Sequence, residues 1–145
     1  MYSHTIPSFT LINALAAVGI AVLFILLCGL IKEPYRQQFN ALMIAGAGAA
    51  YLSGGLGPWE FVFCTLMTFI AFLGYRRYVF IGIGWLLHSG WDILHHLYGN
   101  PIVPFSASSS AGCAVCDAIL AIWFLYKAPA IIPLIYKTRI NNTAN

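Results

Sequence analysis

The sequence predicts an all-α fold, a small polytopic membrane bundle of about five transmembrane helices. Of its 145 residues, 61% are hydrophobic and 8% are charged, whereas about a quarter of the residues of a soluble domain are charged. Apolar stretches recur along the chain, and the basic residues fall only in alternate connections between them. These observations predict a single integral membrane domain over residues 1–145. They exclude a nucleic-acid partner, because the chain has no basic tail or basic domain.

Five apolar stretches are the expected helices. The first, residues 9–31, is uncharged and long enough to span a bilayer, which takes about 20 residues. We expect an anchored helix there and not a cleaved signal, because no Lys or Arg precedes it and it is longer than a signal-peptide core. The other four stretches are residues 39–52, 59–74, 79–97 and 111–126, of which only 79–97 approaches the usual spanning length. Residues 127–145 are expected to lie along the cytoplasmic interface of the membrane.

The basic residues predict the orientation of the bundle. In a five-helix arrangement all seven fall on one side: Lys32, Arg36, Arg76, Arg77, Lys127, Lys137 and Arg139. Basic connections stay in the cytoplasm. The N-terminus is therefore expected outside and the C-terminus in the cytoplasm.

The fourth stretch carries the most informative side chains. His88, Asp92, His95 and His96 fall within an arc of about 100° on one helical face, in a segment otherwise apolar enough to lie in a membrane. Ionisable groups in such a segment are costly to bury and point to a function. Imidazole and carboxylate groups spaced three or four residues apart on a helix can bind one metal ion. The sequence therefore predicts that these four residues ligate a divalent metal, zinc or iron.

The predicted topology brings further polar residues to the same outer half of the membrane. Glu60 lies in the first turn of the third helix and Asp117 in the first turns of the fifth. Either carboxylate could complete the metal shell or orient a ligating imidazole. In a hydrolase, either one would be the catalytic base for a metal-bound water.

Cys113 and Cys116 form a Cys-x-x-Cys pair near the expected start of the fifth helix. On the outer side of a membrane such a pair is compatible with a disulfide, a redox pair or two soft metal ligands. Alternatively, both cysteines are unreactive and contribute only to the packing of the helices. The chain has no second pair with zinc-finger spacing, which excludes a structural zinc site made of four cysteines.

Three sequence blocks carry a family resemblance: YLSGGLGPWEF, YVFIGIGWLLHSGWDILHHLYGNPIVPF and SSSAGCAVCD. Between Lys32 and Trp123 the chain resembles the small bacterial integral membrane proteins of domain of unknown function 6010. The resemblance implies a small helical fold in the bacterial cytoplasmic (inner) membrane. It implies no reaction, so the function must be argued from the site.

The leading functional prediction is a membrane metalloenzyme that acts on a lipid or another apolar substrate at a site near the outer face. One alternative is a transporter of protons, ions or small solutes, which would need a polar route to the cytoplasm. Another is a non-catalytic membrane assembly protein in which the polar cluster only holds helices together. The lipid bilayer is the expected partner, and the sequence leaves the oligomeric state open.

Overall fold

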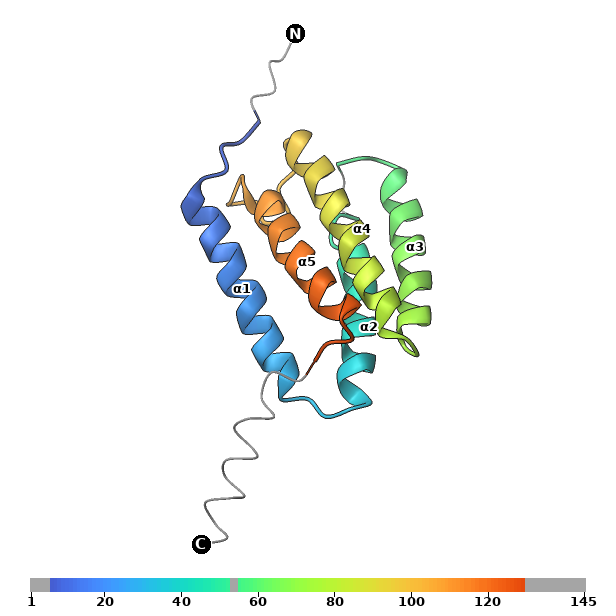
Figure 1. Cartoon of the computed structure of the whole chain (residues 1–145). Helices are drawn as coiled ribbons and strands as arrows, with labels where there is room; N and C mark the ends of the chain where they lie inside the picture. The colour runs from blue at the N-terminus through green and yellow to red at the C-terminus, as the bar shows by residue number, and fades with distance from the viewer. Residues whose placement is uncertain (1–5, 53–54, 130–145) are drawn as a thin grey trace, which may run out of the picture.

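The computed structural model describes residues 6–52 and 55–129, which form five α-helices and no β-strand (Figure 1). The helices are α1 (Leu11–Gly29), α2 (Tyr35–Gly48), α3 (Trp59–Gly74), α4 (Tyr78–Leu97) and α5 (Ser109–Leu125). They run alternately in opposite directions, so that the α1–α2 and α3–α4 connections and the end of α5 lie at the same end of the bundle (Figure 1). This confirms the prediction of an all-helical fold with five helices for the described part of the chain.

Four helices lie close to their predicted bounds, and α2 does not. It begins at Tyr35 instead of residue 39 and ends at Gly48 instead of residue 52. Pro34 directly precedes the helix, and proline favours the start of a helix because it lacks an N–H group. The first turns of α2 bury Arg36 and Asn40. A search for apolar residues therefore places the start of this helix one turn too late.

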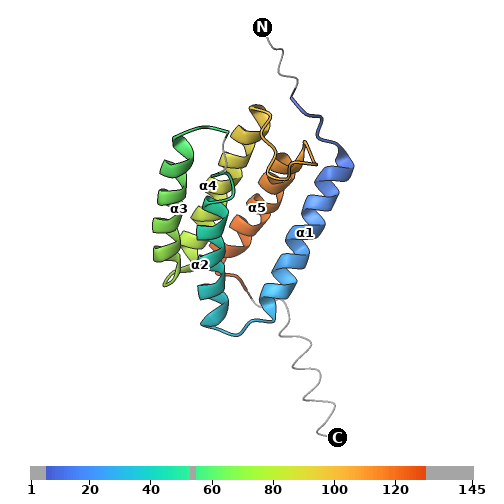
Figure 2. The ribbon, with the colours of Figure 1, turned by 180° about the vertical axis from the view of Figure 1, so that it is seen from behind.

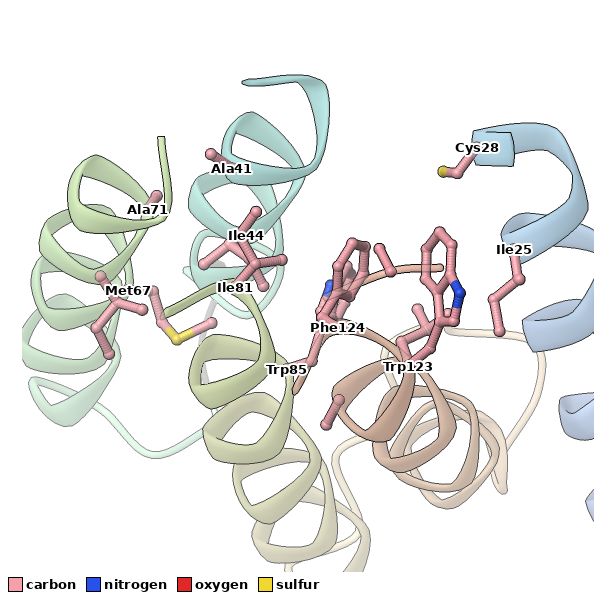
Figure 3. Packing of buried hydrophobic residues seen from close by; sticks show 14 of the residues in the cluster. Ile25, Cys28, Ala41, Ile44, Met67, Ala71, Ile81, Trp85, Trp123 and Phe124 are labelled. Carbon is pink, nitrogen blue, oxygen red and sulfur yellow. The ribbon is translucent and has the colours of Figure 1, made fainter. Parts of the chain in front are cut away.

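The apolar core lies toward the end of the bundle where α2 and α4 begin. Figure 3 shows Ile44 of α2 and Met67 of α3 beside Ile81 of α4, with Trp85 and Phe124 packed next to them. Large apolar side chains also cover the outer surface: Ile12 is 78% exposed, Phe72 is 70% exposed and Leu42 is 66% exposed. The bundle is therefore apolar both inside and outside.

Among the described residues, α1 alone is both long and apolar enough to cross a membrane, judged by length and composition. α3 and α5 are apolar but shorter. Five basic residues are described, and all lie in the connections or helix ends at one end of the bundle: Lys32, Arg36, Arg76, Arg77 and Lys127. The number of spans and their orientation stay predictions, and the expected interfacial tail lies outside the described residues from position 130 onward.

The helices approach one another closely at glycines. A Cβ atom built on Gly48 of α2 would overlap the side chain of Met67 of α3, and one built on Gly82 of α4 would lie 2.7 Å from Leu125 Cγ of α5. Small residues at such crossings let two backbones pack closely, as is common in membrane bundles. α4 and α5 form the most extensive pair, while α1 packs chiefly against α5 at one side of the bundle (Figures 1 and 2).

Candidate functional site

Three polar side chains meet between α4 and α5: His88, Asp92 and Asp117. We call this group the acidic histidine site. Their exposed fractions are 3%, 0% and 5%. His88 Nδ1 lies 2.7 Å from Asp117 Oδ2 and 3.3 Å from Asp92 Oδ2. One ligand atom from each residue fits within a set of atoms no more than 4.8 Å apart. A group of this size can hold one metal ion.

The orientation of the His88 ring is fixed by the backbone of α2. His88 Nε2 lies 2.9 Å from the carbonyl oxygen of Ala47. A carbonyl oxygen can only accept a hydrogen bond, so Nε2 carries a hydrogen and donates it. Nδ1 therefore presents either a lone pair or a second proton to the two carboxylates. The first form suits a metal ligand, and the second is an imidazolium ion.

Tyr51, in the connection after α2, ties the site to the end of the bundle where α2 ends and α5 begins. Its hydroxyl group donates to Asp92 Oδ1 over 2.6 Å and lies 2.9 Å from Ser110 Oγ of α5. Burial raises the pKa of the Tyr51 phenol above its ordinary value, and the Asp92 carboxylate raises it further, so the phenol keeps its proton. Asp92 Oδ2 is buried and has no hydrogen-bond partner among the described residues. This oxygen is directed at His88 and is free to bind a cation.

Glu60 and His95 form a second polar pair. His95 Nε2 lies 3.0 Å from Glu60 Oε1. The Glu60 carboxylate also accepts hydrogen bonds from the backbone N–H of Leu56 and from Trp91 Nε1. The His95 ring stacks on the Tyr51 ring, with centroids 3.6 Å apart. Tyr51 thus contacts both polar groups, through its hydroxyl on one and through its ring on the other.

The structure divides the residues that the sequence pattern grouped together. Of the predicted ligands, it brings His88 and Asp92 together and adds Asp117, which was predicted as a base or supporting carboxylate. His95 pairs with Glu60 instead. His96 lies apart from both groups and lines a cavity of about 330 Å³ between α4 and α5.

Cys113 and Cys116 form no disulfide and line a groove between α1 and α5. The metal, redox and catalytic roles of all these residues stay predictions.

Sequence reasoning missed the residues that hold the site in place. Tyr51 has a hydroxyl group that could have drawn attention to it, but its partners lie far away in the sequence. Ala47 contributes only a backbone carbonyl, which leaves no trace in a sequence. Ser110 bridges Tyr51 to the α4–α5 connection, since its hydroxyl donates to the carbonyl oxygen of Asn100 over 2.9 Å.

No curated protein and no solved structure is significantly similar to this chain. One family model matches it, over residues 12–130, which cover every residue of the site and all five helices apart from Leu11, the first residue of α1. The chain therefore belongs to the family of unknown function DUF6010.

Proposed function

We propose that this protein is an integral membrane protein that binds one divalent metal ion at His88, Asp92 and Asp117. The metal is zinc or iron, and the protein is a membrane metalloenzyme acting on a lipid or another apolar substrate. The observation that carries this proposal is the fixed orientation of His88. Its Nε2–H group donates a hydrogen bond to the carbonyl oxygen of Ala47, so that Nδ1 faces two buried carboxylates.

The surface of the bundle supports a membrane location. Monomeric soluble proteins rarely expose apolar patches larger than a few hundred Å², yet here every helix has large apolar side chains exposed to its surroundings. The described basic residues all lie at one end of the bundle, as the positive-inside rule requires for a protein whose helices cross the membrane in alternating directions. In this arrangement the acidic histidine site lies nearer the outer face.

The chemistry of the site supports a divalent metal. Two carboxylates and one neutral imidazole carry a net charge of −2, which is costly to bury without a cation. A backbone carbonyl that accepts the other N–H group of a histidine is the usual support for a metal-ligating imidazole. One imidazole and two carboxylates are ligands for zinc or iron and also suit manganese. Three protein ligands leave a coordination position for water or substrate, as in catalytic zinc sites.

When bound, a metal in this environment lowers the pKa of a coordinated water and polarises a carbonyl or phosphoryl oxygen. The protein's own residues hold the site together. Tyr51 keeps Asp92 in place, and the apolar walls exclude bulk water. Glu60 accepts hydrogen bonds from two donors, Leu56 N–H and Trp91 Nε1, and lies 3.0 Å from His95 Nε2. We therefore assign it to positioning His95 rather than to direct proton transfer.

Metal analysis tests the proposal directly. The full-length protein is expressed with zinc, iron or manganese in the medium, purified in detergent and measured by elemental mass spectrometry. We expect about one ion per chain in the wild type. Removing one ligand should lower metal affinity by roughly tenfold to a hundredfold or more, so His88→Ala and Asp117→Asn should lose most of the metal. His96→Ala is the matched control, because this histidine lies on the same helix outside the site, and it should retain the metal.

The result that overturns the proposal is a wild-type protein without metal in all three media, or unchanged metal content in the double variant His88→Ala/Asp92→Ala. Asp117→Asn preserves the shape of the side chain, which guards against loss of metal through unfolding. The thermal transition of each variant, measured in the same detergent, shows whether it is folded.

A second candidate function follows from one distance. The 2.7 Å between His88 Nδ1 and Asp117 Oδ2 is the length of a charge-assisted hydrogen bond, and it suits a protonated histidine that joins α4 to α5 without a metal. Under this alternative the protein is a non-catalytic membrane component with a polar packing cluster. A wild-type protein that is free of metal and whose thermal transition is unchanged by chelator would favour it.

A further inference from the structure

An apolar recess outside the acidic histidine site forms a groove between α1 and α5. Its volume is about 400 Å³, and it lies along the half of α1 that leads toward the outer end of the bundle. One wall is formed by Ile12, Ala16 and Ile20 of α1, and the other by Gly112, Cys113 and Cys116 of α5. Small residues on both walls, Ala16 of α1 and Gly112 of α5 among them, leave space between the two helices.

We infer that this groove binds one hydrocarbon chain of a membrane lipid. None of the described residues that line it is charged, so they offer no partner to an ion or a charged peptide. Two of its α1 residues, Ile12 and Ile20, are more than half exposed, which makes the groove continuous with the apolar surface of the bundle. An extended peptide would leave its backbone polar groups unsatisfied there, whereas a hydrocarbon chain has none.

The polar groups of the groove lie at its outer rim. Asn13 Nδ2 donates to Ser108 Oγ over 2.5 Å, and this bond joins α1 to the residue before α5. Ser109 completes a neutral rim of hydroxyl and amide groups. An amphiphile would therefore bind with its chain between the helices and its polar part against these side chains. This combination of an apolar wall and a few placed polar groups is characteristic of ligand sites.

The groove also reaches the neighbourhood of the proposed metal. Cys113 lies four residues before Asp117 on α5, one helical turn away. A lipid in the groove would thus lie one turn from a ligand of the acidic histidine site. This inference rests on the membrane location in the proposed function and specifies its substrate class, a lipid with a hydrocarbon chain. Lipid binding in the groove needs no metal, so the lipid site and the metal site can be disproved separately.

Photolabelling tests the inference on the whole protein. The protein is reconstituted in vesicles of phosphatidylethanolamine and phosphatidylglycerol that include a small fraction of phosphatidylethanolamine with a diazirine on one acyl chain. After illumination, mass spectrometry compares the label on the peptides that line the groove with the label on the exposed face of α3, which reports contact with bulk lipid. We expect the groove to be labelled several times more strongly than α3 in the wild type.

Glycine substitutions supply matched variants. Gly112 lines the groove, and a Cβ atom built on it meets nothing within 4 Å, so Gly112→Phe adds a ring to the groove wall at a position with room for a Cβ atom. Within a bilayer a displaced chain returns to an equally apolar environment, so the variant acts by occupying the space of the chain. We expect it to reduce labelling of the groove to the level of α3. Gly19 of α1 also has nothing within 4 Å and does not line the groove, so Gly19→Phe should leave the labelling pattern unchanged.

Equal labelling of groove and α3 in the wild type would overturn the inference, and so would unchanged labelling in Gly112→Phe. Metal content is measured on the same samples. A labelled groove in a protein without metal would retain the lipid site and remove the proposed metal centre. A metal-loaded protein with an unlabelled groove would retain the proposed metal centre and remove the lipid site.

Discussion

Single residues decide whether the acidic histidine site can hold a cation. His88 contributes one nitrogen to the site because Ala47 occupies the other. The two oxygens of Asp92 have different partners in the same way. Oδ1 accepts a hydrogen bond from Tyr51, and Oδ2 is directed at His88. His88 and Asp92 are therefore each oriented by a group outside the site. Such supporting groups commonly contribute tenfold to a hundredfold in metal affinity.

Tyr51→Phe removes the phenol hydroxyl and keeps the ring that stacks on His95. We expect metal affinity to fall about tenfold, because Asp92 Oδ1 loses its donor and its carboxylate is no longer held in place. Competition with a metal-binding dye measures the change. Thr68→Val serves as the comparison, because it also removes one hydroxyl, here bonded only within α3 to Cys64 O. Equal affinity in the two variants would show that Tyr51 does not support the site.

The sequence alone could identify the polar residues of the site but not their partners. Helical spacing places His88, Asp92, His95 and His96 on one face of α4, and this periodicity correctly indicates a polar interior. It cannot separate them into two groups, because the separation depends on Tyr51 and Glu60, which come from other elements. Nor can spacing show that a backbone carbonyl determines which nitrogen of His88 faces the carboxylates.

At the scale of helices, glycine positions determine how closely the elements pack. α2 offers a direct comparison between two glycines on the same helix. A Cβ atom at Gly48 would overlap Met67, whereas one at Gly46 meets nothing within 4 Å. Gly48 is buried and Gly46 is exposed. The same residue type therefore has different packing at the two positions, Gly46 within α2 and Gly48 at its last residue.

We expect Gly48→Ala to destabilise the folded bundle by about 1–3 kcal/mol, because the added methyl group forces α2 and α3 apart. Gly46→Ala should be neutral or stabilising by up to about 1 kcal/mol, because alanine favours the helix. Thermal unfolding in detergent, followed by circular dichroism, measures both. Similar transitions for the two variants would contradict the packing of α2 on α3.

Apolar runs predicted the existence of all five helices and located α3 and α4 to within a residue. They failed at the start of α2 because Arg36 and Asn40, both polar, are buried there. Asn40 Nδ2 donates to the carbonyl oxygen of Arg36, and the Arg36 side chain pairs with Glu33. Buried polar residues that satisfy one another in this way belong to the helix, although their composition resembles that of a loop.

For the whole molecule, the location of the basic residues predicts the orientation. A reporter fused after Thr10 or inserted near Ser108 should be active outside the cytoplasm, and one fused after Lys137 should be active inside it. Alkaline phosphatase and green fluorescent protein fusions measure the two sides, since the first is active outside and the second fluoresces inside. A Lys137 fusion active outside would overturn the orientation and the number of spans together.

The close contacts at glycines affect how members of this family should be compared. Gly74 faces Ile81, and Gly84 faces Ile44, so helix spacing is set by residues that take no part in the polar site. A related chain could keep these contacts and replace the buried polar residues together by apolar ones, an exchange that is often neutral for folding. Shared ancestry would then be no guarantee of shared chemistry. Members of the family are best sorted first by whether they retain the two aspartates and the histidine, and only then compared for what they do.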